Sequence, residues 1–380
     1  MALQSSGVIK FSDINVELGN NPTDELSLSD PDIRTLFETP SGTIKISTGY
    51  GKSNRVQVTI TLSSNQTNYQ LTTASVPGYS AGNTDVTLQI NSGVYVYSTA
   101  TTNAGLIVGP FDSGDTVSIV NNGYIIGRGG NGGDSNGLSI GDNRGPAETS
   151  PTSGGPAINL NYPVSITNYS YIAGGGGGGA SLYCAGGGGA GGGTGGTARV
   201  ASNTTISTGL GGAGGSIGQA GSNGAVAFST SATYVKGAGG GGGRIIIGAG
   251  GEGGANYAWR GNPADCIGRG GQEGGGGGGG GYGEEVDNQE DAYGGGGGGR
   301  AGGGLGGNGT QSRPNGSTTA GGNSLGYGAG GGGGPWGGSG GSSITPGAST
   351  RAGAAGGKAV NLNGNSVTWI ATGIRYGAIS

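Results

Sequence analysis

The sequence predicts a mainly β and irregular fold in three parts. We expect a small N-terminal module over residues 1–53, an antiparallel β domain over residues 54–126, and a Gly-rich domain over residues 127–380. In the middle part, apolar and polar residues alternate with the period of two that is typical of a half-buried strand. In the last part, most of the 102 glycines of the 380-residue chain gather in runs. Average Gly usage is only about 7%, so this part predicts polyglycine-II helices bracketed by β-strands.

The N-terminal module contains two helix signals. Ser12 is a suitable cap for a short helix over residues 13–18, and Gly19 is a suitable end. In the second signal Asp30 is the expected cap, and Pro31 occupies the first helical position, where its missing N–H costs nothing.

The middle part reads as a series of short strands. Residues 56–62 alternate strictly between apolar and polar side chains. Further strands are expected around two turn signals, Asn91-Ser92-Gly93 and Asn121-Asn122-Gly123. Since short turns join antiparallel strands, we expect a small antiparallel sheet.

The glycine runs could be flexible linker, the usual reading of Gly-rich sequence. Three features argue against it: the runs are several, strand-like residues 165–173 lead directly into the first one, and Trp, Tyr and Arg lie between them. A polyproline-II-type helix has three residues per turn and no internal hydrogen bonds. Its N–H and C=O groups must therefore pair with neighbouring helices when buried. Because ordering each residue costs about 1–2 kcal/mol, we expect a cooperative bundle bounded by the strand-like residues 157–172 and 358–379.

Composition excludes several classes of function. The chain has no His, which removes the commonest general base and metal ligand, so we expect no enzyme, metal or cofactor. With 17 Lys plus Arg and a net charge of −4, there is no basic block of the kind that binds nucleic acid. The N-terminus has no signal-peptide pattern, so synthesis in a cytoplasm is expected, with Cys184 and Cys266 as two reduced thiols.

Two short motifs imitate catalytic ones. Residues 137–141 read G-L-S-I-G, like a nucleophile elbow, but that elbow requires a His partner. Residues 49–53 end like a phosphate-binding loop, but Ile46 occupies the place of its first Gly. The first is read as a loop, and the second as a strand end followed by a turn.

Residues 121–380 resemble the distal adhesin of T-even-like phage long tail fibres. The landmarks that carry the resemblance are NNGYIIGRGGNGG (121–133), GGPAINLNYPVSITNYSYIAGGGGGGA (154–180), the alternating glycine runs, and GGKAVNLNGNSVTWIATGIRYGAIS (356–380). In that family the Gly-rich domain is a sandwich of polyglycine-II helices whose tip loops bind outer-membrane proteins or other surface receptors. The resemblance implies the same fold, a tail-fibre location in the virion, and a host outer-membrane protein or surface polysaccharide as partner.

Residues 1–53 resemble a segment that opens many tailed-phage structural proteins. This implies a virion-attachment module that contacts other tail proteins. Tail fibres are often trimeric, so a homotrimer stays open, although no residue pattern shows a coiled coil.

The candidate receptor contacts lie between glycine runs. Tyr, Trp and Arg dominate binding hot spots, and a core of glycine backbone leaves large side chains to the loops. The acidic segment 284–291 could be a solvated loop, a receptor loop that meets basic groups, or a calcium site. Trp369, in the closing strand, is expected in the core. The candidate contacts are Tyr257, Trp259, Arg260, Tyr282, Glu284, Glu285, Asp287, Tyr293 and Trp336.

Three functions follow in order of preference. The first is an adhesin that binds a host receptor through loops between polyglycine-II helices. The second is a structural fibre or decoration protein of the capsid, neck or tail without receptor binding. The third, an enzyme such as a depolymerase, lacks a clustered acid and base in the sequence.

Overall fold

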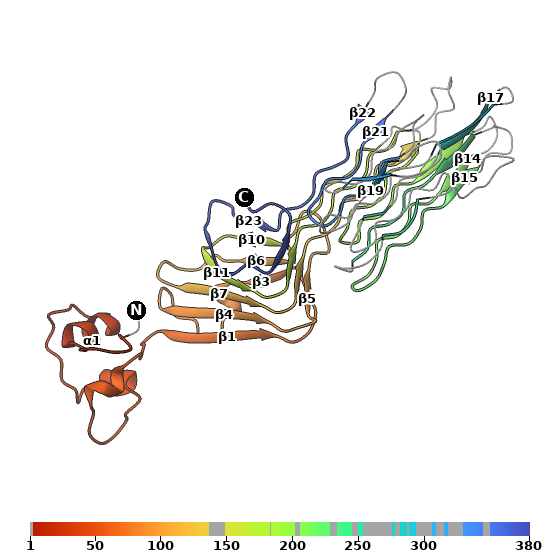
Figure 1. The fold of residues 1–380 in the computed structure, drawn as a ribbon. Coiled ribbons are helices and arrows are strands. Elements are labelled where there is room, and N and C mark those ends of the chain that lie inside the picture. Colours follow the sequence, from red (N-terminus) through yellow and green to blue (C-terminus); the bar gives the residue numbers. More distant parts are fainter. Residues whose placement is uncertain are drawn as a thin grey trace. The chain divides into compact units, whose positions relative to one another are not determined.

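The computed structural model describes residues 3–136, 149–182, 184–201, 206–228, 234–244, 250–253, 276–277, 282–286, 289–293, 306–308, 315–317, 330–344 and 350–380. The chain forms two compact units, shown in Figure 1. One comprises Met1–Ile60, Thr72–Thr87 and Pro110–Ser118, and the other comprises Thr61–Leu71, Leu88–Gly109 and Ile119–Ser380. Within these ranges, none of the helices has the length and apolar character needed to span a bilayer.

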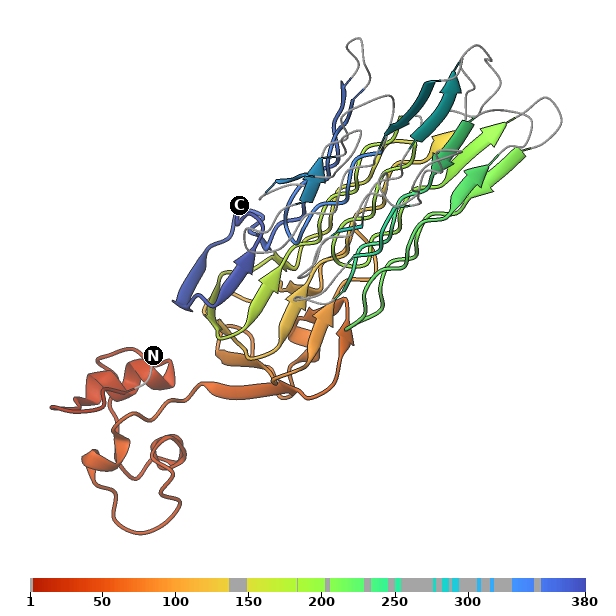
Figure 2. The ribbon, with the colours of Figure 1, turned by 45° about the vertical axis from the view of Figure 1, so that its right-hand side comes forward.

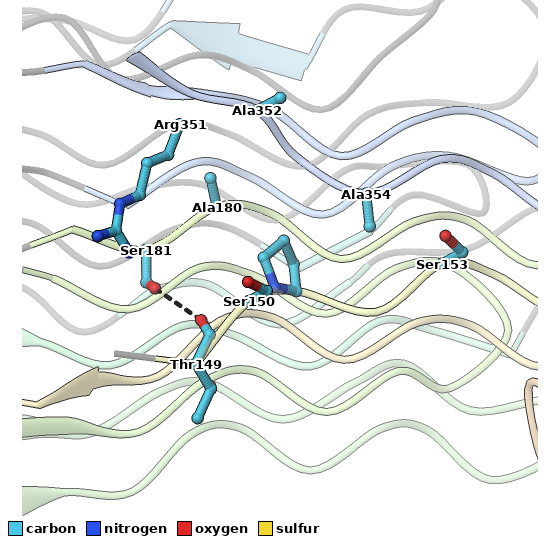
Figure 3. Close-up of a pocket in the computed structure, with 9 residues that line it drawn as sticks. Thr149, Ser150, Ser153, Ala180, Ser181, Arg351, Ala352 and Ala354 are labelled. Atoms are coloured by element: carbon cyan, nitrogen blue, oxygen red, sulfur yellow. Dashed lines mark hydrogen bonds between the residues drawn. The ribbon is translucent and has the colours of Figure 1, made fainter. Parts of the chain in front are cut away.

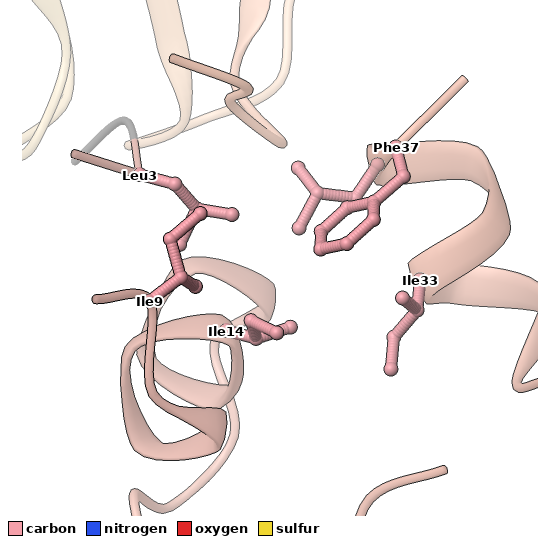
Figure 4. Packing of buried hydrophobic residues seen from close by; sticks show 6 residues of the cluster. Leu3, Ile9, Ile14, Ile33 and Phe37 are labelled. Carbon is pink, nitrogen blue, oxygen red and sulfur yellow. The ribbon is translucent and has the colours of Figure 1, made fainter. Parts of the chain in front are cut away.

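The first unit contains the N-terminal helices α1 (Phe11–Leu18) and α2 (Pro31–Leu36). Figure 4 shows their small core, in which Ile14 and Ile33 are fully buried beside Phe37. The prediction of Ser12 as the first cap is wrong. Helix α1 begins two residues earlier than expected because Lys10 is the cap, and its backbone N–H donates to Asp13 Oδ2 at 2.8 Å.

The other helix boundaries match the sequence signals. Gly19 ends α1 in the left-handed conformation, with φ of 80°, as its lack of a Cβ permits. Asp30 precedes α2 and Pro31 opens it. The Asp30 carboxylate accepts from Ser27 N–H at 2.9 Å, outside the helix, so it organises the entering turn.

An ion pair anchors the early strands of the first unit. Arg55 Nε donates to Asp85 Oδ1 at 2.7 Å, and Gln57 and Thr116 also donate to this carboxylate. Burial acts to raise the pKa of Asp85, but the hydrogen bonds from Thr116, Arg55 and Gln57 outweigh it, so the pKa lies below its ordinary value.

Most of the strands form three sheets, and successive strands along the chain belong to the first, second and third sheet in turn. The strand orders are β1-β4-β7-β11-β24, β2-β5-β8-β12-β25 and β3-β6-β10-β23. Each turn of chain thus adds one strand to each sheet in sequence, so the architecture is a three-sided β-solenoid. The strands of its five turns are β1 (Val56–Leu62), β2 (Gln66–Thr67), β3 (Tyr69–Leu71); β4 (Thr84–Ile90), β5 (Tyr95–Tyr97), β6 (Leu106–Val108); β7 (Thr116–Asn121), β8 (Tyr124–Ile126), β10 (Ile158–Leu160); β11 (Val164–Asn168), β12 (Tyr171–Ala173), β23 (Val360–Asn361); and β24 (Val367–Ala371), β25 (Ile374–Tyr376).

The predicted antiparallel orientation is therefore wrong, although the mainly β class is confirmed. β5 pairs with β8, β8 with β12 and β12 with β25, all in parallel. The turn signals at residues 91–93 and 121–123 join strands of different sheets, so they are corners of the solenoid rather than hairpin ends. Alternation alone gives no strand direction, because either orientation places every second side chain inside.

The long excursions of the chain leave the solenoid at one corner, between the sheet that contains β8 and the sheet that contains β10. In the second turn, residues 98–105 connect β5 to β6. In the third turn, residues 127–157 connect β8 to β10. In the fourth turn, residues 174–359 connect β12 to β23. The Gly-rich domain is thus two insertions at the same corner of the solenoid. The β-strands that bracket it belong to successive solenoid turns, which explains why strand-like sequence leads directly into glycine.

Residues 174–180 show how the glycine segments pair. Gly175 N–H donates to Gly155 O at 2.9 Å, and three residues later Gly178 N–H donates to Thr152 O at 3.0 Å. The residues between and after them donate to two other segments with the same period of three, which is the period of a polyglycine-II helix. The carbonyls of residues 174–180 accept from three further segments. The accepting neighbours are 152–155, 187–190 and 338–341, and the donating neighbours are 130–133, 331–334 and 354–357.

Six neighbours leave no room for side chains. A Cβ on Gly178 would lie 1.8 Å from the carbonyl oxygen of Asn131, and one on Gly177 would lie 2.0 Å from that of Ala354. Real Cβ contacts do not approach this closely, so the lattice requires Gly at these positions. The predicted polyglycine-II packing is present in the described part of the domain. We call this part of the molecule the glycine bundle.

Where the glycine bundle meets the solenoid, aromatic side chains replace glycine. Tyr95, Tyr124, Tyr171 and Tyr376 stack in that order along one sheet, with ring centroids 4.4, 5.7 and 6.3 Å apart. Trp336 is 3% exposed and packs in the same cluster, with Ile126, Ala173 and Ala190.

Arg244 lies at the same end of the bundle. Its Nε donates to Gly191 O at 2.9 Å, and its guanidinium carbon lies 5.5 Å from the centre of the Tyr97 ring. This aromatic and cationic cluster joins the outer face of the solenoid to the first turns of the bundle.

Candidate receptor-binding end

The end of the glycine bundle away from the solenoid carries a second set of strands, visible in Figures 1 and 2. They form small sheets in which β9 (Ser135–Asn136) pairs with β13 (Ala198–Ala201), and β13 pairs with β14 (Ile206–Gly209). Another sheet has the order β15-β16-β17-β18. Its strands are β15 (Val226–Phe228), β16 (Tyr234–Gly237), β17 (Tyr282–Val286) and β18 (Gln289–Tyr293). We call this end, with strands β13–β18 and the segments that join them, the distal end.

The glycine helices lead directly into these strands. The parallel pairing of β9 and β13 continues the hydrogen bonds of the helices before them, since Gly132 N–H donates to Thr194 O and Ser135 N–H donates to Thr197 O. Asp134 reinforces the junction, because its Oδ1 accepts from Thr197 N–H at 2.7 Å. The distal end is therefore held by the same lattice that orders the bundle.

Several predicted contact residues fall at this end. Tyr282, Glu284 and Glu285 lie on β17, and Tyr293 lies on β18. Tyr257, Trp259, Arg260 and Asp287 lie outside the described residues. The role of all eight in binding stays a prediction.

The acidic segment 284–291 forms two arms of a β-hairpin. β17 and β18 pair antiparallel, with Glu284 opposite Asp291 and Glu285 opposite Glu290. The described arms of this segment are therefore paired strands.

Trp336 differs from the other candidates in position. It lies in the turn after residues 331–334, inside the aromatic cluster at the solenoid end, and is almost fully buried. The sequence could not distinguish a turn at one end of the bundle from a loop at the other, because that requires the direction of each helix. Trp336 is a packing residue at the base of the bundle.

Two other expectations concern burial. Trp369 on β24 is half-buried, with the guanidinium carbon of Arg375 4.5 Å from its ring centre, rather than fully inside the core. Cys184 is fully buried next to the glycine lattice, and Cys266 lies outside the described residues. Whether the two thiols pair stays a prediction.

The flank of the bundle has a depression (Figure 3) that no local sequence pattern indicates. Three segments border it: residues 149–153, 180–181 and 351–354. It has a volume of about 630 Å³ and a largely polar lining. Its detection needs three segments distant in sequence, so no local pattern could have revealed it.

Residues 57–240, just under half of the chain, match the model of the family described as phage tail fibre adhesin Gp38. This part of the chain is a phage tail-fibre adhesin domain. The match begins in strand β1 and ends in the glycine bundle, so it takes in most of the solenoid and the first distal strands. The resemblance found in the sequence and the adhesin function are thereby confirmed, and a tail location in the virion follows from the family.

Two further comparisons concern curated proteins and solved structures. No curated protein matches the chain. The chain is similar to the crystal structure of the gp37–gp38 adhesin tip complex of the bacteriophage S16 long tail fibre, at 17% sequence identity and a TM-score of 0.39, with all of both chains covered. A TM-score this low adds no argument about the fold of the adhesin domain.

Proposed function

We propose that the chain attaches a phage particle to its host cell by binding a surface receptor with the distal end of the glycine bundle. The observation that carries this proposal is the lattice itself. The helix of residues 174–180 is hydrogen-bonded to six neighbours, so the distal strands rise from a rigid base. Because the ordering cost is met before the encounter, such a scaffold suits a binding surface. Connecting segments can also vary in sequence without disturbing the scaffold.

The chemistry of the distal end favours a receptor with exposed basic groups. The hairpin β17–β18 places Glu284 opposite Asp291 and Glu285 opposite Glu290. Because this segment is acidic in sequence, Lys or Arg side chains of a partner would complement its charge, and complementary charge mainly speeds the encounter and selects the partner. Tyr257, Trp259 and Arg260, in the segment before the glycine run 274–281 that precedes β17, supply the hot-spot residue types. The partner is a host outer-membrane protein or a surface polysaccharide.

The N-terminal module is proposed to hold the adhesin on the virion through other tail proteins. It has its own core of Ile14, Ile33 and Phe37, which contains no residue of the glycine bundle. A module of this kind can be fixed to a tail while the other unit meets the host. Synthesis in the host cytoplasm and action at the host surface complete the proposal.

Binding of the purified protein to intact host cells tests the proposal. We expect saturable binding to susceptible cells and none to phage-resistant mutants that lack the receptor. The matched control is the same protein after heat unfolding. Equal binding to susceptible and resistant cells, or none to either by a folded protein, would contradict receptor recognition and favour a structural role in the fibre.

A further inference from the structure

Two arginines at the solenoid end of the bundle carry charge that is withdrawn from water. Arg244 is 8% exposed, and its Nε donates to Gly191 O at 2.9 Å. Arg128 is half-buried, and within the described part of the chain its guanidinium makes no hydrogen bond, ion pair or ring contact. Because removal of a charge from water is costly, a buried charge normally has a partner of opposite sign. These two arginines are therefore candidates for an anion site.

Arg128 belongs to a row of side chains on the surface of one glycine helix. Residues 128, 131 and 134 are three positions apart, so they lie on the same side of a helix with a period of three. The other two side chains accept from the neighbouring segment: Asn131 Oδ1 from Thr194 N–H at 3.1 Å, and Asp134 Oδ1 from Thr197 N–H at 2.7 Å. A guanidinium has donors but no acceptor, so Arg128 cannot continue this pattern.

The same period brings Arg128 to the corner that Arg244 occupies. Three positions before Thr194 in the neighbouring segment is Gly191. Its carbonyl oxygen accepts from Gly129 N–H at 3.1 Å as well as from Arg244 Nε. The residue that follows Arg128 and the side chain of Arg244 therefore meet at one oxygen atom.

Among the described residues, no carboxylate forms an ion pair with either arginine. Asp134, the acidic residue of the same helix, is six positions from Arg128, roughly 19 Å along a helix that rises about 3.1 Å per residue. Salt screens charges over about 8 Å at physiological ionic strength. Burial lowers the pKa of Arg128, which is the expected effect on a cation without a counter-charge.

We infer that Arg128 and Arg244 bind a phosphate group at the solenoid end of the bundle. Each guanidinium presents a planar fork of N–H donors that matches two phosphate oxygens. A phosphate monoester carries a charge of about −1.5 to −2 at pH 7, which matches two guanidinium groups better than the single charge of a carboxylate does. The source is free phosphate or the phosphate of a larger molecule such as a phosphorylated sugar. The site lies away from the distal end, so the inference goes beyond the proposed function and does not depend on it.

Phosphorus NMR with the full-length protein tests the inference. The broadening of the phosphorus lines of inorganic phosphate and of glucose 6-phosphate is measured at constant ionic strength as protein is added. Inorganic phosphate should bind with a dissociation constant of about 1 mM, the weak end of specific affinity. Equal binding of the two probes would identify the phosphate alone as the ligand, and tighter binding of glucose 6-phosphate would identify a phosphorylated sugar. Acetate should compete at least about tenfold more weakly than phosphate, because it has one charge and two oxygens.

Variants locate the binding. Arg128→Gln should weaken phosphate binding about tenfold or more. Arg128→Lys keeps the charge without the planar fork, so its affinity should lie between those of the wild type and Arg128→Gln. Arg199→Gln, the same change at an exposed position on β13, is the matched control and should bind as the wild type does.

Thermal unfolding supplies a second readout that a merely structural role would not change. A ligand that binds the folded state raises the unfolding temperature. Phosphate should therefore raise this temperature for the wild type and for Arg199→Gln, relative to chloride at equal ionic strength, but not for Arg128→Gln. An unfolding temperature of Arg128→Gln in chloride close to that of the wild type shows that the variant is folded.

Three outcomes would overturn the inference. They are no broadening of either probe by the wild type at about 20 mM probe, equal competition by acetate, and equal phosphate binding by folded Arg128→Gln. Phosphate binding by a protein that ignores host cells would refute the proposed function alone.

Discussion

Asn121 Nδ2 donates a hydrogen bond to Asn168 Oδ1 at 2.8 Å, and both side chains are buried at the same corner of successive solenoid turns. Asn168 Nδ2 donates in turn to Thr372 O at 2.9 Å, in the fifth turn. Between Asn168 and Thr372 lies the whole second insertion of the glycine bundle. These two asparagines therefore link the third, fourth and fifth solenoid turns, and the last link connects residues on either side of the second insertion.

Asn168→Ala should destabilise the protein by about 1–3 kcal/mol, because it removes the buried acceptor of Asn121 Nδ2 and Ser170 N–H and the donor to Thr372 O. Chemical unfolding measures the effect. Thr167→Ala, on the outward face of the same strand, is the matched control and should change the stability by less than about 0.5 kcal/mol. Equal effects of the two changes would show that the two linked asparagines contribute nothing particular.

Gly178→Ala should disrupt the glycine bundle, since its Cβ would lie 1.8 Å from Asn131 O. The cost should reach or exceed the roughly 1–3 kcal/mol of ordinary overpacking. Gly218→Ala is the control: its φ is 74° but no atom lies within 4 Å of the added Cβ, so it should cost only about 1–2 kcal/mol of backbone strain. Calorimetric unfolding temperatures compare them. An unchanged unfolding temperature for Gly178→Ala would contradict the close lattice.

Asp85→Asn should make the stability less dependent on pH. The lowered pKa of Asp85 contributes stability that is fully present above the unfolded value of about 3.9 and is lost as pH falls through the folded value. Near neutral pH we expect the variant to be less stable by about 0.2–1 kcal/mol, the range for partly exposed ion pairs. The difference should vanish below the folded pKa. A constant difference from pH 7 to pH 2 would show that the charge is irrelevant.

Trp336→Ala should cost about 3–5 kcal/mol, as truncation of a buried aromatic does. At low temperature the folded variant should bind host cells as tightly as the wild type does, because Trp336 lies at the solenoid end. Loss of binding with unchanged stability would instead make Trp336 a contact residue.

The sequence predicted the class of the fold but not the pairing and direction of its strands. Gly content and the several runs with Trp, Tyr and Arg between them predicted polyglycine-II packing, and a Cβ-free backbone is needed in a lattice where a Cβ on Gly177 meets Ala354 O at 2.0 Å. The parallel solenoid was missed because its pairing is between residues such as Ile158 and Val360, about 200 positions apart. No local pattern carries that information.

The candidate site shows the same limit. Residue types drew attention to the acidic segment, whose arms are strands β17 and β18 at the distal end, and its role in binding stays a prediction. Residue types misplaced Trp336, because the end of the bundle at which a turn lies depends on how many helices precede it and in which direction each runs. The division into three domains at residues 53 and 126 stays a prediction.

Replacement of residues 282–293 by a Gly-Ser segment of equal length tests the central claim most directly. The readout is binding of the purified variant to susceptible host cells, at an unfolding temperature equal to that of the wild type. Gln219→Ala, in the turn beside Arg244 at the solenoid end, is the control. The account predicts that the replacement abolishes binding and the control retains it. Full binding by a folded protein without this hairpin would contradict the assignment of the receptor contact to the distal end.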